Sequence, residues 1–281
     1  MKTRIIVDST VDVTDELRQR IHVIPLRVLF GDEEFIDGVT ITPRDFYQRL
    51  VDSATLPTSS QPSPDSFEQV YEEVTAAGDE AVVLTISSKL SGTYQSACIA
   101  AEDYPNIHVV DTLTATIASG VLAELALRLA DEGMDAKSIA QRITEARERV
   151  CLLAAFDTLE YLKKGGRLSA TAALAGSLLS IKPIISLPGG EIAVLGKARG
   201  HRKANEMLMA EIENHGGMDL SMPVLRGYTG LSSETLEKFL SDSAQLWGDL
   251  PADQRAVPLC SVIGTHAGPG AYAAAFFRKN N

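Results

Sequence analysis

Short apolar runs alternate with amphipathic segments along the first half of the chain. Apolar and β-branched residues dominate four runs that predict strands, at residues 4–8, 22–30, 81–86 and 107–112. Two predicted helices lie between them, each opened by a hydroxyl side chain and a proline, at residues 42–43 and 63–64. Gly78 follows the second helix, where a terminating glycine is expected. This alternation predicts an α/β domain with a largely parallel sheet.

A long apolar helix is predicted in the middle of the chain, at residues 114–132. It is apolar over most of its circumference, so we expect it to be buried on more than one side. A more polar helix is predicted at residues 136–149. The apolar run at residues 151–156 is then expected to return to the first sheet.

The second half of the chain has shorter apolar runs separated by glycine-containing turns. The PGGE stretch at residues 188–191 lies between two such runs and predicts a β-hairpin. Helices are predicted at residues 203–214 and 232–247. Antiparallel strands with separate helices are typical of α+β domains. We therefore expect an N-terminal α/β domain at residues 1–155 and a C-terminal α+β domain at residues 156–281.

Composition narrows the class of protein. Of the 281 residues, 45% are hydrophobic and 22% are charged, which is typical of globular domains. The net charge of −11 argues against general binding to nucleic-acid phosphates. The three cysteines form no C-x-x-C pair, so neither a disulfide framework nor a metal site is expected. No apolar run reaches the ~20 residues of a membrane span, and MKTRIIVDST enters a strand at once, unlike a signal peptide. We expect a cytoplasmic protein without a cofactor or an integral membrane segment.

Hydroxyl side chains gather where one predicted strand meets a helix, in TISSKLSGTYQSA at residues 85–97. The helix is predicted to start near Ser91, Gly92 and Thr93. A helix start offers unpaired N–H groups and about half a positive charge, so these residues are candidates for binding an anion. Ser91 as a simple N-cap, with the other hydroxyls exposed, is the structural alternative.

Two other segments carry candidate polar groups. Ser59 and Ser60 precede the helix that starts at residues 63–64, where a polar loop leading to a cap is the alternative. In residues 261–276 an apolar strand is expected to enter a glycine-rich loop and then a helix of small residues. Its three glycines permit close approach of a ligand. His266 lies in this expected loop, although a lone histidine there is usually structural.

Known catalytic motifs match poorly. The serine in KLSGT lacks the first glycine of a nucleophile elbow, and GPGAYA lacks the lysine of a phosphate-binding loop. GTHAGPG matches a dinucleotide fingerprint only loosely and lies at the wrong end of the chain. A serine acyl hydrolase or transferase using Ser91, His266 and Asp111 stays open as an alternative.

Six ordered blocks together resemble the DegV family of bacterial fatty-acid-binding proteins. The blocks span essentially the whole chain and lie at residues 7–13, 58–64, 87–97, 159–169, 181–185 and 264–271. The resemblance implies a two-domain α/β fold with a long-chain fatty acid held between the domains. Similar proteins are the acyl-binding subunit of bacterial fatty acid kinase. There a separate ATP-using subunit phosphorylates the carboxylate, and the acyl phosphate enters phospholipid synthesis.

The resemblance also implies site residues. In the family, a hydroxyl of the T-S-Q block and the serine of S-G-T hold the carboxylate, which here are Ser59 and Ser91. Ser60, Gly92, Thr93 and His266 are the neighbouring candidates. The family commonly has threonine where this chain has Ser59, and the hydroxyl survives that change.

Neutral hydroxyls can satisfy a buried carboxylate without a fixed lysine or arginine. The expected tail lining is residues 171–181, Ile184, Ile185, Ile192, Val194 and residues 275–277, although core packing explains these equally well. In LKKGGRLS, Arg167 is a candidate for docking the kinase subunit, and a solvated basic loop is the alternative. We expect a non-catalytic fatty-acid carrier. The alternatives are the hydrolase and a small-molecule kinase or sensor related by fold alone.

Overall fold

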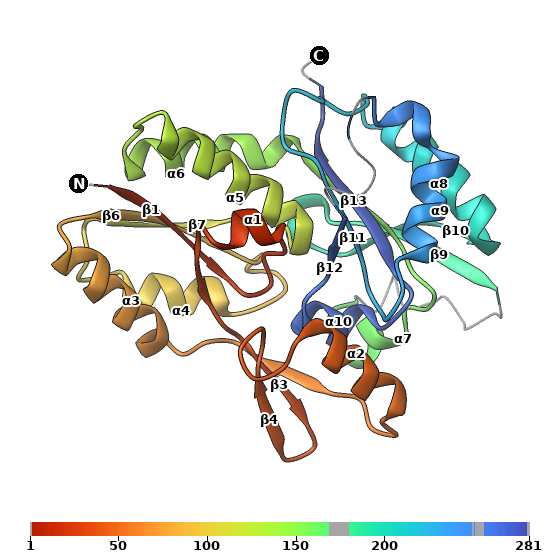
Figure 1. Ribbon diagram of the computed structural model, residues 1–281, viewed down its shortest axis with the longest axis horizontal. Helices are drawn as coiled ribbons and strands as arrows, with labels where there is room; N and C mark the ends of the chain where they lie inside the picture. The colour runs from red at the N-terminus through yellow and green to blue at the C-terminus, as the bar shows by residue number, and fades with distance from the viewer. Residues whose placement is uncertain (1, 169–179, 249, 251–255, 280–281) are drawn as a thin grey trace.

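The computed structural model describes residues 2–168, 180–248, 250 and 256–279, and contains two main sheets side by side (Figure 1). The first sheet is four-stranded, has the order β2-β1-β6-β7 and is parallel throughout. Its strands are β1 (Thr3–Asp8), β2 (His22–Ile24), β6 (Glu80–Thr85) and β7 (Ile107–Asp111). The predicted parallel sheet is confirmed.

Helices cover both faces of the first sheet. Helices α3 (Pro64–Ala76) and α4 (Thr93–Ala100) pack on one face, and α5 (Thr116–Asp131) and α6 (Ala136–Ala146) pack on the other (Figure 1). Successive side chains of β1 point to opposite faces, so Ile5 packs against α5 and α6 while Ile6 packs against α3 and α4. The strands are therefore apolar on both sides.

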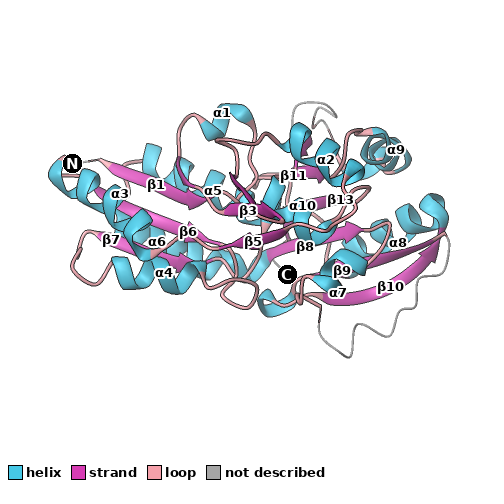
Figure 2. Ribbon diagram, turned by 90° about the horizontal axis from the view of Figure 1, so that it is seen from below, coloured by secondary structure: helices cyan, strands magenta, loops and turns pink. Residues whose placement is uncertain are grey.

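The predicted run at residues 22–30 divides into two strands of different sheets. Pro25 lacks a backbone N–H and interrupts the run. After it, β3 (Arg27–Phe30) pairs with β4 (Glu33–Ile36) and β5 (Thr58–Ser60) in a small antiparallel sheet. In Figure 2, β3 and β5 lie across the junction of the two main sheets. Residues 58–60 are therefore a strand, where a polar loop was the alternative.

The second sheet has the order β10-β9-β8-β13-β11-β12 and is mostly antiparallel. Its strands are β8 (Val150–Ala155), β9 (Ile181–Ser186), β10 (Ala193–Arg199), β11 (Leu225–Tyr228), β12 (Ala256–Pro258) and β13 (Tyr272–Phe277). The predicted hairpin is confirmed, because β9 and β10 pair antiparallel around residues 188–191. The expectation that residues 151–156 return to the first sheet is wrong, since β8 pairs with β13 and β9. The domain division near residue 155 stays a prediction, and this pairing favours a division before β8.

Helix α5 lies between the sheets and contacts strands of both. Twelve of its 16 residues are buried, as its apolar circumference predicts. Helices α8 (Gly200–Asn214) and α9 (Glu234–Asp242) cover the other face of the second sheet (Figure 1). The other α-helices of the described residues are α1 (Asp15–Arg18), α2 (Pro43–Asp52), α7 (Glu160–Lys164) and α10 (Ser261–Ala267). No helix within the described residues is both long enough and apolar enough to cross a membrane.

The prediction for residues 261–276 has strand and helix reversed. Residues 261–267 form α10, which begins after Cys260, whose Sγ accepts a hydrogen bond from the Ile263 N–H. Residues 272–277 form β13, an interior strand between β8 and β11. All six residues of β13 are buried, so no alternation of polar and apolar residues marks them as a strand. His266 therefore lies in the last turn of a helix.

Candidate functional site

A cavity of about 290 Å³ lies where the carboxyl edge of the first sheet meets the second sheet. Its volume is at the lower end of the ~300–1,000 Å³ typical of small-molecule sites. The walls come from both halves of the chain and are mostly apolar. They include Leu26, Ile86, Leu152, Phe156, Leu162, Ile185, Leu187, Ile192 and Ile263. Such a cavity can accept an apolar chain.

Polar groups converge on one part of this cavity. Ser59 on β5 and His266 on α10 are 207 residues apart in sequence, yet Ser59 Oγ lies 2.8 Å from His266 Nε2. Ser60 and Ser91 line the same cavity, as do Gln61 and Thr116. The structure therefore brings together four of the predicted carboxylate-binding residues, which are Ser59, Ser60, Ser91 and His266.

The other two predicted residues support the site from behind. Helix α4 begins at Thr93, with Gly92 as its N-cap residue. Ser91 Oγ lies 2.9 Å from Thr93 Oγ1 and accepts a 3.3 Å hydrogen bond from the Thr93 N–H. A Cβ atom at Gly92 would overlap the Gln61 side chain, so glycine lets the segment that follows β5 approach α4. Thr93 therefore holds Ser91 in place, Gly92 makes room for Gln61, and neither is among the residues lining the cavity.

His266 is a neutral imidazole at physiological pH. Burial lowers the pKa of His266 to about 4, and repulsion by the Arg167 guanidinium contributes in the same direction. Nδ1 is buried and has no hydrogen-bond partner among the described residues. A buried N–H without an acceptor is costly, so we assign the proton to Nε2, which then donates to Ser59 Oγ. The Ser59 O–H is thereby free to donate to another acceptor.

This arrangement differs from a hydrolase triad. His266 contacts Ser59 and not Ser91, and no carboxylate among the described residues bonds to its Nδ1. Asp111 Oδ1 instead accepts from the backbone N–H groups of Ser88 and Leu113. The chain of hydrogen bonds that would activate a serine through His266 and Asp111 is therefore not formed.

An arginine lies at the solvent-facing edge of the cavity. Arg167 follows α7, is exposed, and lines the cavity beside the polar groups. Its guanidinium donates to Leu90 O at 3.1 Å and to Gly165 O at 2.7 Å. The expectation that hydroxyl groups hold a carboxylate without a fixed lysine or arginine stays a prediction. Sequence reasoning singles out Arg167 as a docking candidate but carries no signal that it lines the cavity, because Arg167 reaches the cavity through the loop after α7.

The residues predicted to line the tail are divided between the cavity wall and the hydrophobic cores. Ile185 and Ile192 line the cavity, whereas Ile184, Val194 and residues 275–277 pack in the hydrophobic cores. Residues 171–179 of the predicted lining lie outside the described residues.

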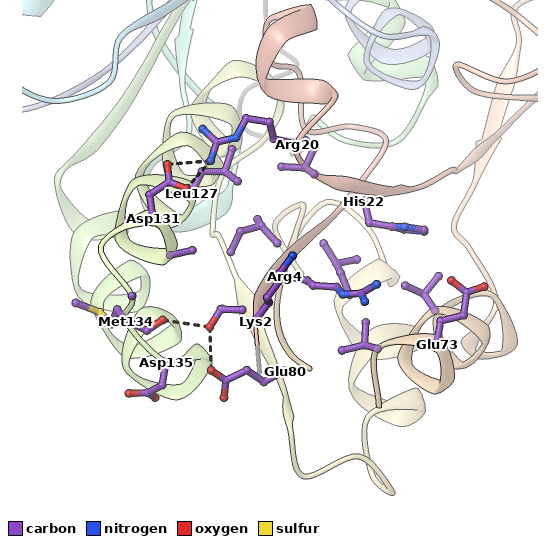
Figure 3. Close-up of a pocket in the computed structure, with 18 of the residues that line it drawn as sticks. Lys2, Arg4, Arg20, His22, Glu73, Glu80, Leu127, Asp131, Met134 and Asp135 are labelled. Atoms are coloured by element: carbon purple, nitrogen blue, oxygen red, sulfur yellow. Dashed lines mark hydrogen bonds and ion pairs between the residues drawn. The ribbon is translucent and has the colours of Figure 1, made fainter. Parts of the chain in front are cut away.

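A larger hollow, of about 610 Å³, lies at the amino edge of the first sheet and has a different character. Figure 3 shows the Arg20–Asp131 ion pair on one of its walls, with His22 and Glu73 on the opposite side. Within the hollow, Thr3 Oγ1 bonds to Glu80 Oε1 at 2.8 Å and to Met134 O at 3.1 Å. Its charged rim is unsuited to an apolar chain. In the described part of the chain, no group of three or more His, Cys, Asp or Glu residues is arranged to hold a metal ion.

Comparison with known proteins identifies the family. A model of the DegV family, described as an uncharacterised protein family, matches residues 2–279. A DegV domain-containing protein of Caldanaerobacter subterraneus is 35% identical over 285 residues, covering 99% of each chain.

Solved structures agree with this match. The fatty-acid-binding DegV family protein of Thermus thermophilus has a TM-score of 0.88 at 31% identity, covering 99% of this chain and 100% of that one. The fatty acid kinase B3 protein of Streptococcus pneumoniae, solved with linoleic acid, shares the fold, with a TM-score of 0.85 at 23% identity over 99% of this chain and 100% of that one. The chain belongs to the DegV family.

Proposed function

We propose that this protein binds a long-chain fatty acid, with the acyl chain in the apolar cavity and the carboxylate at Ser59, Ser91 and His266. The observation that carries the proposal is the Ser59–His266 pair, which lies at one part of an otherwise apolar cavity. The relative from Thermus thermophilus binds a fatty acid with the same fold, which supports it further.

The polar groups match the needs of a carboxylate. A carboxylate only accepts hydrogen bonds, and it is costly to bury unless its oxygens are satisfied. With the His266 proton on Nε2, the Ser59 hydroxyl donates to one oxygen, and the Ser91 hydroxyl is available for the other. Arg167 lies at the cavity edge with its guanidinium bonded to the Leu90 and Gly165 carbonyl oxygens, so we assign the carboxylate contacts to the hydroxyls.

The tail supplies most of the affinity. Burial contributes about 0.8 kcal/mol per methylene, so ~14 methylenes give a gross gain on the order of 11 kcal/mol. Ordering and association offset much of this gain, which leaves binding near the micromolar range or tighter within reach.

We further propose that the chain is non-catalytic and presents the carboxylate to an ATP-dependent fatty acid kinase subunit. The polar part of the cavity borders the exposed Arg167, so a partner could reach the carboxylate there. The fold is shared with the fatty acid kinase B3 protein, and is therefore compatible with this role.

Native mass spectrometry of the purified protein tests the binding step. We expect an added mass of about 250 to 300 Da, released on extraction as an intact fatty acid of ~16 to 18 carbons. Delipidated protein that takes up no added oleic or palmitic acid would contradict the proposal. An ester on Ser91, or ester turnover by the protein alone, would favour the acyl hydrolase.

A variant at Arg167 can distinguish fatty-acid binding from presentation of the carboxylate to the kinase subunit. Changing Arg167 to Glu reverses the charge where the partner is expected to dock, so acyl phosphate formation with a fatty acid kinase subunit and ATP should fall about tenfold or more, and fatty-acid affinity should change less. Changing the nearby exposed Lys163, which does not line the cavity, to Glu is the matched control. Equal losses of binding and phosphorylation in the Arg167 variant would contradict the docking role.

A further inference from the structure

Three buried aspartates lie behind the cavity and are not used by the proposed binding reaction. Asp8, Asp12 and Asp37 are 0%, 4% and 1% exposed, and none of them lines the cavity. Asp8 ends β1, Asp12 follows in the same loop, and Asp37 follows β4. Burying a carboxylate is costly unless hydrogen bonds hold it, so the donors to each one are informative.

Asp12 connects the starts of two helices that line the cavity. Its Oδ1 accepts a 2.9 Å hydrogen bond from the backbone N–H of Cys260, immediately before α10. Its Oδ2 accepts a 2.6 Å hydrogen bond from Oγ1 of Thr116, the first residue of α5 and a cavity-lining residue. One carboxylate thus fixes α10 relative to α5.

Asp37 holds the same end of α10 from another direction. Its Oδ1 accepts a 3.0 Å hydrogen bond from the backbone N–H of Ser261, the first residue of α10. Its Oδ2 accepts from Ser9 Oγ at 2.8 Å, and Ser9 Oγ in turn accepts from the Leu26 N–H at 3.0 Å. Leu26 lines the cavity, so Asp37 links α10 to a second cavity wall.

Asp8 holds the segment that leads to Ser91. Its Oδ2 accepts a 2.7 Å hydrogen bond from the Ile86 N–H, at the carboxyl end of β6. Its Oδ1 accepts from the Thr10 N–H and hydroxyl. The three carboxylates therefore contact the backbone or first residue of three segments that bring polar groups to the cavity, but neither β5 nor the loop that carries Arg167.

From these contacts we infer that Asp12 and Asp37 are positioning residues, which hold α10 so that His266 stays within hydrogen-bond distance of Ser59. Helix α10 has only seven residues and carries His266 in its last turn, so its placement depends on its first N–H groups. Both carboxylates accept from N–H groups at that end. The resulting effect on lipid affinity rests on the proposed function, whereas the effect on His266 does not.

Side-chain ¹⁵N NMR of His266 in lipid-free protein tests the inference, because the Nε2 and Nδ1 signals report the tautomer and the hydrogen bond to Ser59. Changing Asp12 to Ala removes both acceptors and should shift the His266 signals. Changing Asp12 to Asn keeps one carbonyl acceptor for the Cys260 N–H and should restore them. Asp135→Ala is the matched control, because it removes a helix N-cap at α6, far from the cavity.

We expect Asp12→Ala also to weaken fatty-acid binding about tenfold or more, with Asp12→Asn and Asp135→Ala within about twofold of wild type. Unchanged His266 signals in Asp12→Ala, or an equal shift in Asp135→Ala, would overturn the inference. An equal shift in Asp12→Asn would mean that an acceptor for the Cys260 N–H is not what places His266, and would overturn the inference too.

If Asp12→Ala does not fold, Thr116→Val removes only the hydroxyl that bonds to Asp12 Oδ2. In Thr116→Val, a small shift of the His266 signals away from their wild-type positions supports the inference, and unchanged signals overturn it. If wild-type protein binds no fatty acid, the proposed function fails, while the His266 signals still decide this inference.

Discussion

The two edges of the first sheet carry opposite kinds of polar chemistry. At the amino edge, charged side chains pair with one another near solvent, as Arg4 does with Asp79 and Arg20 with Asp131. At the carboxyl edge, Asp8 and Asp12 are buried and accept hydrogen bonds from N–H and O–H groups. Burial raises the pKa of both, for Asp12 to about 8. Of the four aspartates compared, Asp8 and Asp12 at the carboxyl edge are therefore the strongly desolvated ones.

The comparison shows that size does not identify the binding site. The hollow at the amino edge is about 610 Å³ and the cavity at the carboxyl edge about 290 Å³, yet only the smaller one combines apolar walls with converging hydroxyls. Ligands of open parallel sheets bind beyond the carboxyl ends of the strands, in agreement with this choice. Matched substitutions at the two edges can test it.

The largest expected effect comes from placing a charge in each hollow. Changing Ile192, a half-buried residue of the cavity wall, to Asp should weaken fatty-acid binding about 100-fold or more, because a carboxylate in an apolar site costs several kcal/mol. Changing Val70 to Asp places the same group in the amino-edge hollow and should leave binding within about twofold. Calorimetric titration measures both, and equal losses would remove the distinction between the edges.

The second effect concerns pH. The pKa of His266 is about 4 in the folded protein, below its ordinary value near 6.5, so between these values the unfolded chain binds more protons and stability falls as pH decreases. Changing His266 to Gln should remove this loss, which amounts to at most about 3 kcal/mol. Denaturant unfolding of both proteins at pH 7 and pH 4.5 gives the change in unfolding free energy of each with pH. The buried aspartates contribute equally to both proteins, so their contribution cancels when the two changes are compared. Parallel pH profiles would contradict the buried, neutral His266.

The third effect is the loss of one hydroxyl. Changing Ser91 to Ala should leave a carboxylate oxygen without its donor and weaken binding by about 1–3 kcal/mol, or roughly 5- to 150-fold. Changing Thr3 to Ala removes a hydrogen-bonded hydroxyl at the amino edge and should affect stability only. Unaltered affinity of the Ser91 variant in a lipid titration would refute its role.

The smallest effect is expected at the surface ion pair. In the Arg20–Asp131 pair both side chains are about half exposed, so changing Arg20 to Ala should cost no more than about 1 kcal/mol of unfolding free energy. Fatty-acid affinity should stay the same. A loss of affinity here would mean that the amino edge is coupled to the ligand.

Much of the first sheet could be predicted from the sequence, because β1, β6 and β7 are apolar runs bounded by clear helix starts. The hydrophobic pattern did not predict the secondary structure of segments that are buried on both sides. All six residues of β13 are buried, so they show no alternation of polar and apolar residues that would distinguish a strand from a helix. The apolar run at residues 22–30 was predicted as one strand, but Pro25 interrupts it and the two parts, β2 and β3, belong to different sheets.

For the candidate site, the residues could be predicted from the sequence but their contacts with one another could not. Hydroxyl clusters at helix starts indicated an anion, and the family resemblance linked Ser59, Ser91 and His266. Local patterns could not show that Ser59 and His266 touch, since β5 and α10 meet only through tertiary packing. The same holds for Arg167, which reaches the cavity from a loop, and for Asp12, whose partners lie 104 and 248 residues away.

A crystal structure of the delipidated protein soaked with palmitic acid tests the central claim most directly. The account predicts the carboxylate within hydrogen-bond distance of Ser59 Oγ and Ser91 Oγ, with the acyl chain running between Ile185 and Ile192. A chain lying in the amino-edge hollow, or a carboxylate directed away from Ser59 and His266, would contradict it.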